Sequence, residues 1–151
     1  MASTCQARIR ESCCAIWDGR DIAFCEERRI PWSRYGNWTL DDESEDAGVE
    51  PDECYIFGAT PETKPKPELA LEVVWTSGGI NKLEIYRRLG VGEVWFWKDG
   101  QISVHVLVDN AYEARTESAA VPGIDLSMLC ELVSVTPTSE AREQLRERIR
   151  T

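Results

Sequence analysis

The pattern of apolar and polar positions along the chain predicts a few short elements separated by turn residues. "DECYIFG" indicates a strand over residues 52–57 that is ended by Gly58. "LALEVVW", residues 69–75, is almost continuously apolar, which is typical of a central strand buried on both faces. After the turn "TSGG", the segment "INKLEIYRRLG" predicts a helix that stops at Gly90.

The segment "EVWFWKDGQISVHVLV", residues 93–108, predicts an antiparallel hairpin. Two β-rich runs flank Asp99-Gly100, the strongest short hairpin signal. A two-residue turn there places Trp97 opposite Ile102 and Trp95 opposite Val104. Core packing is the first interpretation of the two tryptophans, with a groove for bases or a dimer surface as alternatives.

The order of the elements predicts the fold class. Residues 1–50 are expected to hold short N-terminal helices and an acidic loop, and "VPGIDLSML" a turn with a short helical segment. "TSEAREQLRERIR" predicts a terminal helix over residues 138–150, capped by Thr138 or Ser139. One strand-to-helix crossover beside a hairpin indicates an α/β domain, bordering on α+β, in which helices pack on a mixed sheet. We expect a single domain over residues 1–151, with its core in residues 51–132.

The net charge of the chain limits the classes of function that it can have. The net charge of −10 argues against a protein that coats nucleic acid through a broad basic surface, but it leaves room for a nuclease with a locally basic or metal-loaded site. Much of the acid lies in "DDESEDAGVEPDE", residues 41–53. We expect residues 41–50 of that run to form a solvated loop.

Cysteine usage and hydropathy bear on location. None of the six cysteines forms a CxxC pair, and the single histidine, His105, is remote from most of them, which argues against a zinc site. No signal peptide is visible, and no segment approaches the roughly 18 apolar residues of a membrane span. A cytoplasmic protein with free thiols and no membrane association is expected.

Three residues carry candidate chemistry: Asp52 at the head of one strand, Glu72 within the next, and Lys82 on the following helix. A carboxylate inside an apolar strand is costly without a partner. If the strands are neighbours, Asp52 and Glu72 converge and offer hard oxygen ligands for Mg²⁺ or Mn²⁺. An ammonium beside such an ion can hold the attacking water and offset charge on a phosphodiester.

Each of the candidate residues also has a purely structural interpretation. Glu72 can be a structural carboxylate paired with Arg or Lys, and Lys82 a solvated helix residue. Tyr86, four residues after Lys82, can touch the same site or be a core tyrosine with a satisfied hydroxyl. Glu53 is expected on the opposite face of its strand, outside the site. His105 is expected to be structural.

The motifs also resemble a known family. "PDECYIFG", "PELALEVVWTSGGINKLEIYRRLGVGEVWFW" and "DGQISVHVL", followed by "PGIDL", are similar to the Uma-two family of restriction endonucleases, in the PD-(D/E)xK nuclease superfamily. Pro51-Asp52 matches "PD" and Glu72 matches the acidic residue. The superfamily usually has a Lys two residues after that Glu. Here the position holds Val74, and the match for the lysine is Lys82 on the helix.

This resemblance implies a restriction-endonuclease-like fold and hydrolysis of DNA with a divalent metal. Asp52 and Glu72 would bind Mg²⁺ or Mn²⁺, and Lys82 would stabilise the transition state. A homodimer is expected by analogy, since cutting both strands needs two sites. The alternatives are an inactive member of the same fold that acts as a binding or assembly module, favoured by the acidic surface, and a nuclease of RNA or of single strands.

Overall fold

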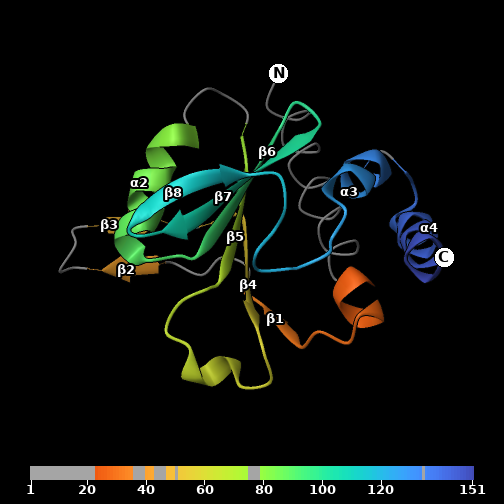
Figure 1. Ribbon diagram of the computed structural model, residues 1–151, viewed down its shortest axis with the longest axis horizontal. Coiled ribbons are helices and arrows are strands. Elements are labelled where there is room, and N and C mark those ends of the chain that lie inside the picture. The colour runs from red at the N-terminus through yellow and green to blue at the C-terminus, as the bar shows by residue number, and fades with distance from the viewer. Residues whose placement is uncertain (1–22, 36–39, 43–46, 50, 75–78, 134) are drawn as a thin grey trace. The chain divides into compact units, whose positions relative to one another are not determined.

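The structure, a computed structural model, describes residues 23–35, 40–42, 47–49, 51–74, 79–133 and 135–151 (Figure 1). Two compact units divide the chain between them. One is Pro31–Ile124, and the other combines Met1–Ile30 with Asp125–Thr151. The expectation of a single domain stays a prediction.

The first unit is built on a six-stranded sheet, in the order β1-β4-β5-β6-β7-β8. β5 and β6 run parallel, and every other neighbouring pair in this sheet is antiparallel. Helix α2, Gly79–Leu89, lies in the connection between the two parallel strands. This mixed sheet with packed helices confirms the expected α/β, restriction-endonuclease-like architecture. The strands are β1 (Trp32–Arg34), β4 (Glu53–Phe57), β5 (Leu69–Val73), β6 (Glu93–Lys98), β7 (Gln101–Val108) and β8 (Ala111–Arg115).

Helix α2 ends as its sequence predicts. Gly90 adopts φ +71°, a conformation that glycine enters without strain. Its N–H donates to the Arg87 carbonyl at 3.1 Å, and the Val91 N–H donates to the Tyr86 carbonyl at 3.1 Å. These two bonds form a Schellman motif, which stops the helix and sends the chain back toward the sheet.

The β6–β7 hairpin has the predicted register, with Trp95 opposite Val104 and Trp97 opposite Ile102. Asp99 and Gly100 both have positive φ, at 51° and 76°, as this type of two-residue turn requires. Trp95 and Trp97 are buried, 1% and 8% exposed, which confirms core packing and removes the reading of an open groove.

β8, the last strand of this sheet, was not predicted from the sequence. Asp109 and Asn110 adopt φ 49° and 65°, and this second two-residue turn joins β7 to β8. The signal was present, because Asp and Asn tolerate the left-handed conformation better than other residues apart from glycine. β8 carries mostly exposed side chains, so its hydrophobic alternation is weak.

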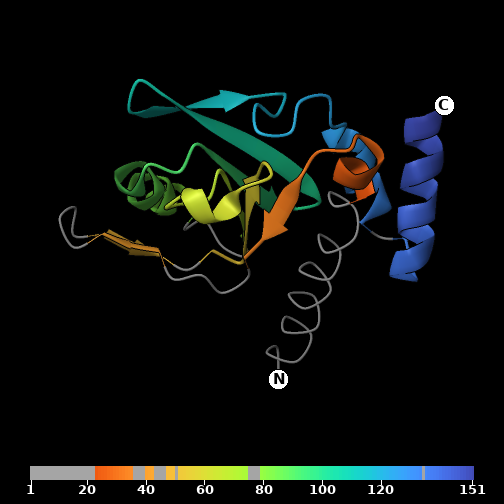
Figure 2. The ribbon, with the colours of Figure 1, turned by 90° about the horizontal axis from the view of Figure 1, so that it is seen from below.

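The expectation of a solvated loop over residues 41–50 was wrong. β2 (Leu40–Asp42) and β3 (Ala47–Val49) form an antiparallel hairpin in this stretch. The hairpin packs against α2, and both views show it beside that helix (Figures 1 and 2). Leu40 is 5% exposed in a cluster with Ala70 and Tyr86. Burial of this one apolar side chain anchors an acidic segment that composition alone would leave in solvent.

The second unit is helical where the structure describes it. It contains residues 23–27, α3 (Leu126–Leu132) and α4 (Thr138–Arg150). The short helix and the terminal helix were both predicted, but α4 has Pro137 as its N-cap and no side-chain cap bond, so capping by Thr138 or Ser139 was wrong. Of the expected N-terminal helices, the one over "ARIRESCCAIWDG", residues 7–19, lies outside the described residues.

The apolar stripe of α4 is covered within the chain. Ala141 and Leu145 are both fully buried, and α3 packs against α4. On the exposed side, Arg146 and Arg150 bond Glu26 and Glu27, each at 2.8 Å. In the part of the chain that the structure describes, no helix is long and apolar enough to cross a bilayer.

Candidate functional site

Glu72 is buried in the middle of β5, with 1% of its surface exposed. It pairs in register with Phe96 of the parallel neighbour β6, and alternation along the strand places it on the same face as Ala70. That face is the one on which α2 lies, because Ala70 and Phe96 cluster with Tyr86 of the helix. A carboxylate here needs donors to replace the water that it has lost.

Two donors come from α2. The Lys82 Nζ lies 2.8 Å from Glu72 Oε2, and the Tyr86 hydroxyl donates to Glu72 Oε1 at 2.5 Å. Lys82 and Tyr86 are four residues apart, so their side chains share one face of the helix. Lys82 therefore extends from the helix to Glu72, a contact that the sequence alone could not establish. Both interpretations of Tyr86 are confirmed, because it is a fully buried core tyrosine and its satisfied hydroxyl contacts Glu72.

Asp52 stands immediately before β4 and is half-buried. Its Oδ2 accepts a hydrogen bond of 2.8 Å from the backbone N–H of Val73, the residue after Glu72. Since β4 pairs with β5, this bond fixes the Asp52 carboxylate at the C-terminal end of β5. The two carboxylates named from sequence are therefore brought to the same end of the sheet.

The electrostatics of Glu72 are set by opposing effects. Burial raises its pKa, hydrogen bonds from Lys82 and Tyr86 and the charge of Lys82 lower it, and the charge of Asp52 raises it. The net pKa lies above its usual value. Burial and the neighbouring Glu72 also raise the pKa of Tyr86, so Tyr86 is a hydroxyl donor at any physiological pH.

The oxygen atoms at this point suit a hard divalent cation. Glu72 and Asp52 repel one another electrostatically, and a shared cation would remove that repulsion. Each carboxylate oxygen has a second lone pair, so Glu72 can accept its two hydrogen bonds and still act as a ligand. Among the described residues no group of three or more His, Cys, Asp or Glu side chains is placed to bind a metal. A metal here would therefore be held by two carboxylates, with water or backbone oxygen completing its shell.

The neighbours of these residues have structural partners. Glu53 is 3% exposed and accepts from Arg34 Nε at 2.7 Å, with a second bond from the same guanidinium, so it lies outside the site as expected. Val74, in the place of the usual superfamily lysine, donates its N–H to the Trp97 carbonyl at 2.8 Å. His105 packs edge-on against Phe96, with ring centroids 5.4 Å apart, in keeping with a structural role.

A third buried carboxylate, Glu93 at the start of β6, was not predicted from the sequence. It is 2% exposed. Oε1 accepts from Trp95 Nε1 and Ser118 Oγ, both at 2.6 Å, and Oε2 accepts from the N–H groups of Ala119 and Ala120 at 2.9 and 2.7 Å. All four donors are neutral. Glu93 therefore ties the chain after β8 to the sheet and has no charged partner among these four.

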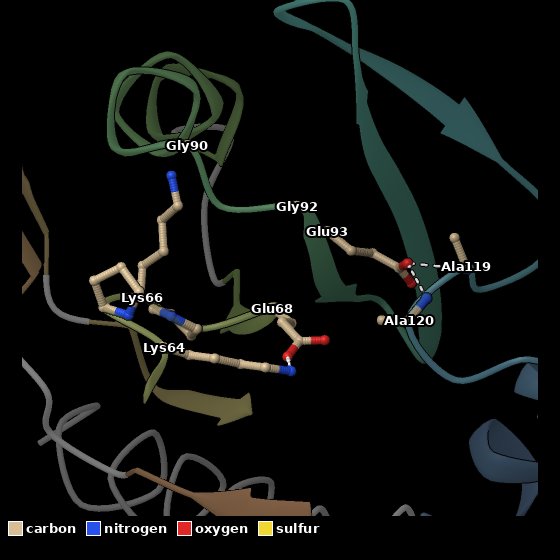
Figure 3. A pocket seen from close by; sticks show the side chains of 10 residues that line it. Lys64, Lys66, Glu68, Gly90, Gly92, Glu93, Ala119 and Ala120 are labelled. Carbon is tan, nitrogen blue, oxygen red and sulfur yellow. Dashed lines mark hydrogen bonds and ion pairs between the residues drawn. The ribbon is translucent and has the colours of Figure 1, made fainter. Parts of the chain in front are cut away.

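Glu93 borders a pocket of about 510 Å³ at the N-terminal ends of β5 and β6 (Figure 3). Lys64 and Glu68 both line it and form an ion pair with one another. Asp52 bonds at the opposite, C-terminal end of β5, so the pocket is separate from the Glu72 site. Its lining comes from Lys64, Pro65, Lys66, Pro67, Glu68, Gly90, Gly92, Glu93, Ala119 and Ala120.

Comparison with known proteins adds the family. No curated protein matches the sequence significantly. The Uma2 family model, whose description reads "Putative restriction endonuclease", matches residues 16–136, well over half of the chain. The matched region contains both carboxylates, Lys82 and Tyr86. The chain belongs to the Uma2 family.

Proposed function

We propose that this protein is a divalent-metal-dependent endonuclease that hydrolyses DNA phosphodiester bonds. The observation that carries the proposal is the setting of Glu72. It is a carboxylate with 1% exposure, bonded by the ammonium of a lysine whose side chain is 44% exposed, and it feels the charge of a second carboxylate. An ion pair with a purely structural role gains nothing from Asp52, because the charge of Asp52 raises the pKa of Glu72 and so disfavours the ionised carboxylate.

Asp52 and Glu72 would hold Mg²⁺ or Mn²⁺. The ion would lower the pKa of a bound water and polarise the phosphodiester. The chain's own contribution is positional. The Val73 N–H holds Asp52 at the strand end, and burial keeps Glu72 in one orientation. Together they form a rigid pair of oxygen ligands on adjacent strands.

Lys82 would act on the substrate. Its side chain is partly open to solvent, so the ammonium can exchange its bond to Glu72 for one to a phosphate oxygen or to the attacking water. A cation at this point offsets the negative charge that grows on the phosphate in the transition state. Lys82 would thus take the part that a lysine two residues after the glutamate plays in the PD-(D/E)xK superfamily, whose motif Pro51-Asp52, Glu72 and Lys82 resemble.

DNA is the proposed substrate, because the chain belongs to a family described as restriction endonucleases. Cleavage of both strands of a duplex by one site type requires two copies, so we further propose a homodimer. Sedimentation of the purified protein tests the dimer independently of activity.

A second candidate is a catalytically inactive binding or assembly module with the same fold. The net charge of −10 favours it, because a polyanionic substrate is repelled by an acidic surface. The two candidates differ in one measurable respect. An inactive module has no reason to bind a divalent cation at Asp52 and Glu72.

The test combines metal binding with cleavage. Wild type, Asp52→Asn, Glu72→Gln and Lys82→Met are incubated with supercoiled plasmid in Mg²⁺ or Mn²⁺, with single-stranded DNA and RNA as parallel substrates. Lys98→Met, an exposed lysine at the end of β6, is the matched control. We expect nicking by wild type and the control, and a loss of at least about 100-fold in the three site variants.

The outcomes separate the candidates. If calorimetry detects no Mn²⁺ binding to wild type, and wild type cuts no substrate faster than Asp52→Asn, the nuclease proposal is wrong and the binding module is favoured. Cleavage of RNA or of single strands alone would keep the chemistry and overturn the choice of duplex DNA.

A further inference from the structure

We propose that Tyr86 is a positioning residue that keeps the Glu72 carboxylate turned toward the metal while Lys82 is released to the substrate. The inference rests on the proposed function and assigns a role to a residue outside the Asp52, Glu72 and Lys82 set. It starts from the fact that the two oxygens of Glu72 are bonded by two donors of different kinds.

The donors differ first in exposure. Tyr86 is fully buried, whereas the Lys82 side chain is 44% exposed. A buried hydroxyl bonded to a buried carboxylate has no water to exchange with, so breaking the bond would leave both groups unsatisfied. The ammonium of Lys82 can turn to solvent or to a phosphate at little cost.

They differ also in charge. Lys82 carries a positive charge that repels a divalent cation at the same carboxylate. Its bond to Glu72 therefore competes with binding of the metal. The Tyr86 hydroxyl is neutral and stabilises the ionised carboxylate without repelling the cation. A metal at Glu72 would therefore weaken the bond to Lys82 and leave the bond to Tyr86 intact.

The scaffold around Tyr86 makes it a fixed support. Its ring packs in the cluster that contains Leu40, Ala70 and Phe96, and its backbone carbonyl accepts the Val91 N–H that ends α2. The hydroxyl therefore belongs to a residue that is held by both its ring and its backbone. Donors that orient metal ligands from behind commonly affect metal affinity by about 10–100-fold.

The experiment removes a single oxygen atom. Tyr86→Phe keeps the ring. Tyr112→Phe is the matched control, because Tyr112 is partly buried and its hydroxyl donates to the Val91 carbonyl at 2.5 Å and not to Glu72. Mn²⁺ binding is measured by calorimetry, without substrate, on protein whose folded fraction is checked by circular dichroism. We expect Tyr86→Phe to bind Mn²⁺ at least about tenfold more weakly than wild type, and Tyr112→Phe to stay within about twofold.

A second variant tests the division of roles and does not depend on how well Tyr86→Phe folds. Lys82→Met removes the ammonium and leaves Tyr86 in place, so we expect Mn²⁺ affinity that is unchanged or tighter, with cleavage lost. If Tyr86→Phe binds Mn²⁺ as tightly as wild type, the role of Tyr86 is overturned and the metal site is not. The same holds if Lys82→Met binds Mn²⁺ more weakly than wild type and Tyr86→Phe does not. Absence of Mn²⁺ binding in wild type would instead overturn the metal site, and the positioning role with it.

Discussion

Replacement of Glu93 by Gln should destabilise the fold by about 3 kcal/mol. The change preserves shape and removes one acceptor oxygen. In the more favourable orientation of the new amide, its oxygen accepts from Ala119 and Ala120, and its NH₂ faces Trp95 Nε1 and Ser118 Oγ, two groups that now donate to Glu93. The indole N–H then loses the bond to this carboxylate, and loss of a buried hydrogen bond costs about 1–3 kcal/mol.

The other bonds weaken as well. The Ser118 hydroxyl already accepts from the Val121 N–H at 2.9 Å, so accepting from the amide would use its second lone pair and leave its own O–H without the carboxylate. The two backbone bonds change from charged to neutral acceptors, and neutral bonds are roughly half as strong. Since bonds that share one carboxylate are not additive, the sum is best taken as about 2–4 kcal/mol.

Urea unfolding followed by far-ultraviolet circular dichroism measures this loss, and a fall in Tm of about 6–12 °C should accompany it. The matched control is Glu113→Gln on β8, where the carboxylate side chain is 51% exposed and pairs with Arg115 at the surface. That change should alter stability by less than about 0.5 kcal/mol. If Glu93→Gln is as stable as Glu113→Gln, the four bonds contribute nothing net and the reasoning fails.

Three further changes test other parts of the first unit. Arg34→Met should lower the free energy of unfolding by about 1–3 kcal/mol in urea, because Glu53 would stay buried without its partner; a loss below about 0.5 kcal/mol would contradict this. Gly100→Ala should cost about 1–2 kcal/mol through its φ of +76° alone, since a methyl group there meets no atom, whereas Gly92→Ala is the unstrained reference and should cost less. Burial, with a smaller effect of the adjacent Glu53 charge, raises the pKa of the Cys54 thiol to about 12, so iodoacetamide at pH 8 should modify Cys54 only after unfolding in urea; mass spectrometry that finds it labelled in native protein would refute this.

The fold could be predicted where local chemistry and long-range pairing agree. Asp99-Gly100 dictates a tight turn, and the flanking aromatic runs then fall into register without further choice. The β2–β3 hairpin could not be predicted in the same way. Its sequence is dominated by charge, whereas the burial of Leu40 in a cluster with Tyr86 of the distant helix α2 is not visible in the local pattern. Tertiary packing outweighs composition at that point.

The candidate site was accessible to sequence reasoning for a related reason. Glu72 is conspicuous as one charge in an apolar strand, and the family motif directs attention to Asp52 and Lys82. Glu93 is an equally buried carboxylate, yet its sequence context does not distinguish it from an exposed residue at a strand end. Glu93 and Glu72 are distinguished only by their hydrogen-bond donors. Neutral donors, two of them backbone N–H groups, hold Glu93, and a lysine holds Glu72.

The arrangement of β4, β5 and α2 has a consequence for how the protein can diverge. Asp52, Glu72, Lys82 and Tyr86 all come from one continuous stretch of chain, and every bond described among them closes within it. Within the described part of the chain, none of these bonds involves a side chain of residues 23–30, 125–133 or 135–151. Changes in those segments leave these bonds in place, so the segments can diverge in sequence while the geometry of Asp52, Glu72, Lys82 and Tyr86 is kept.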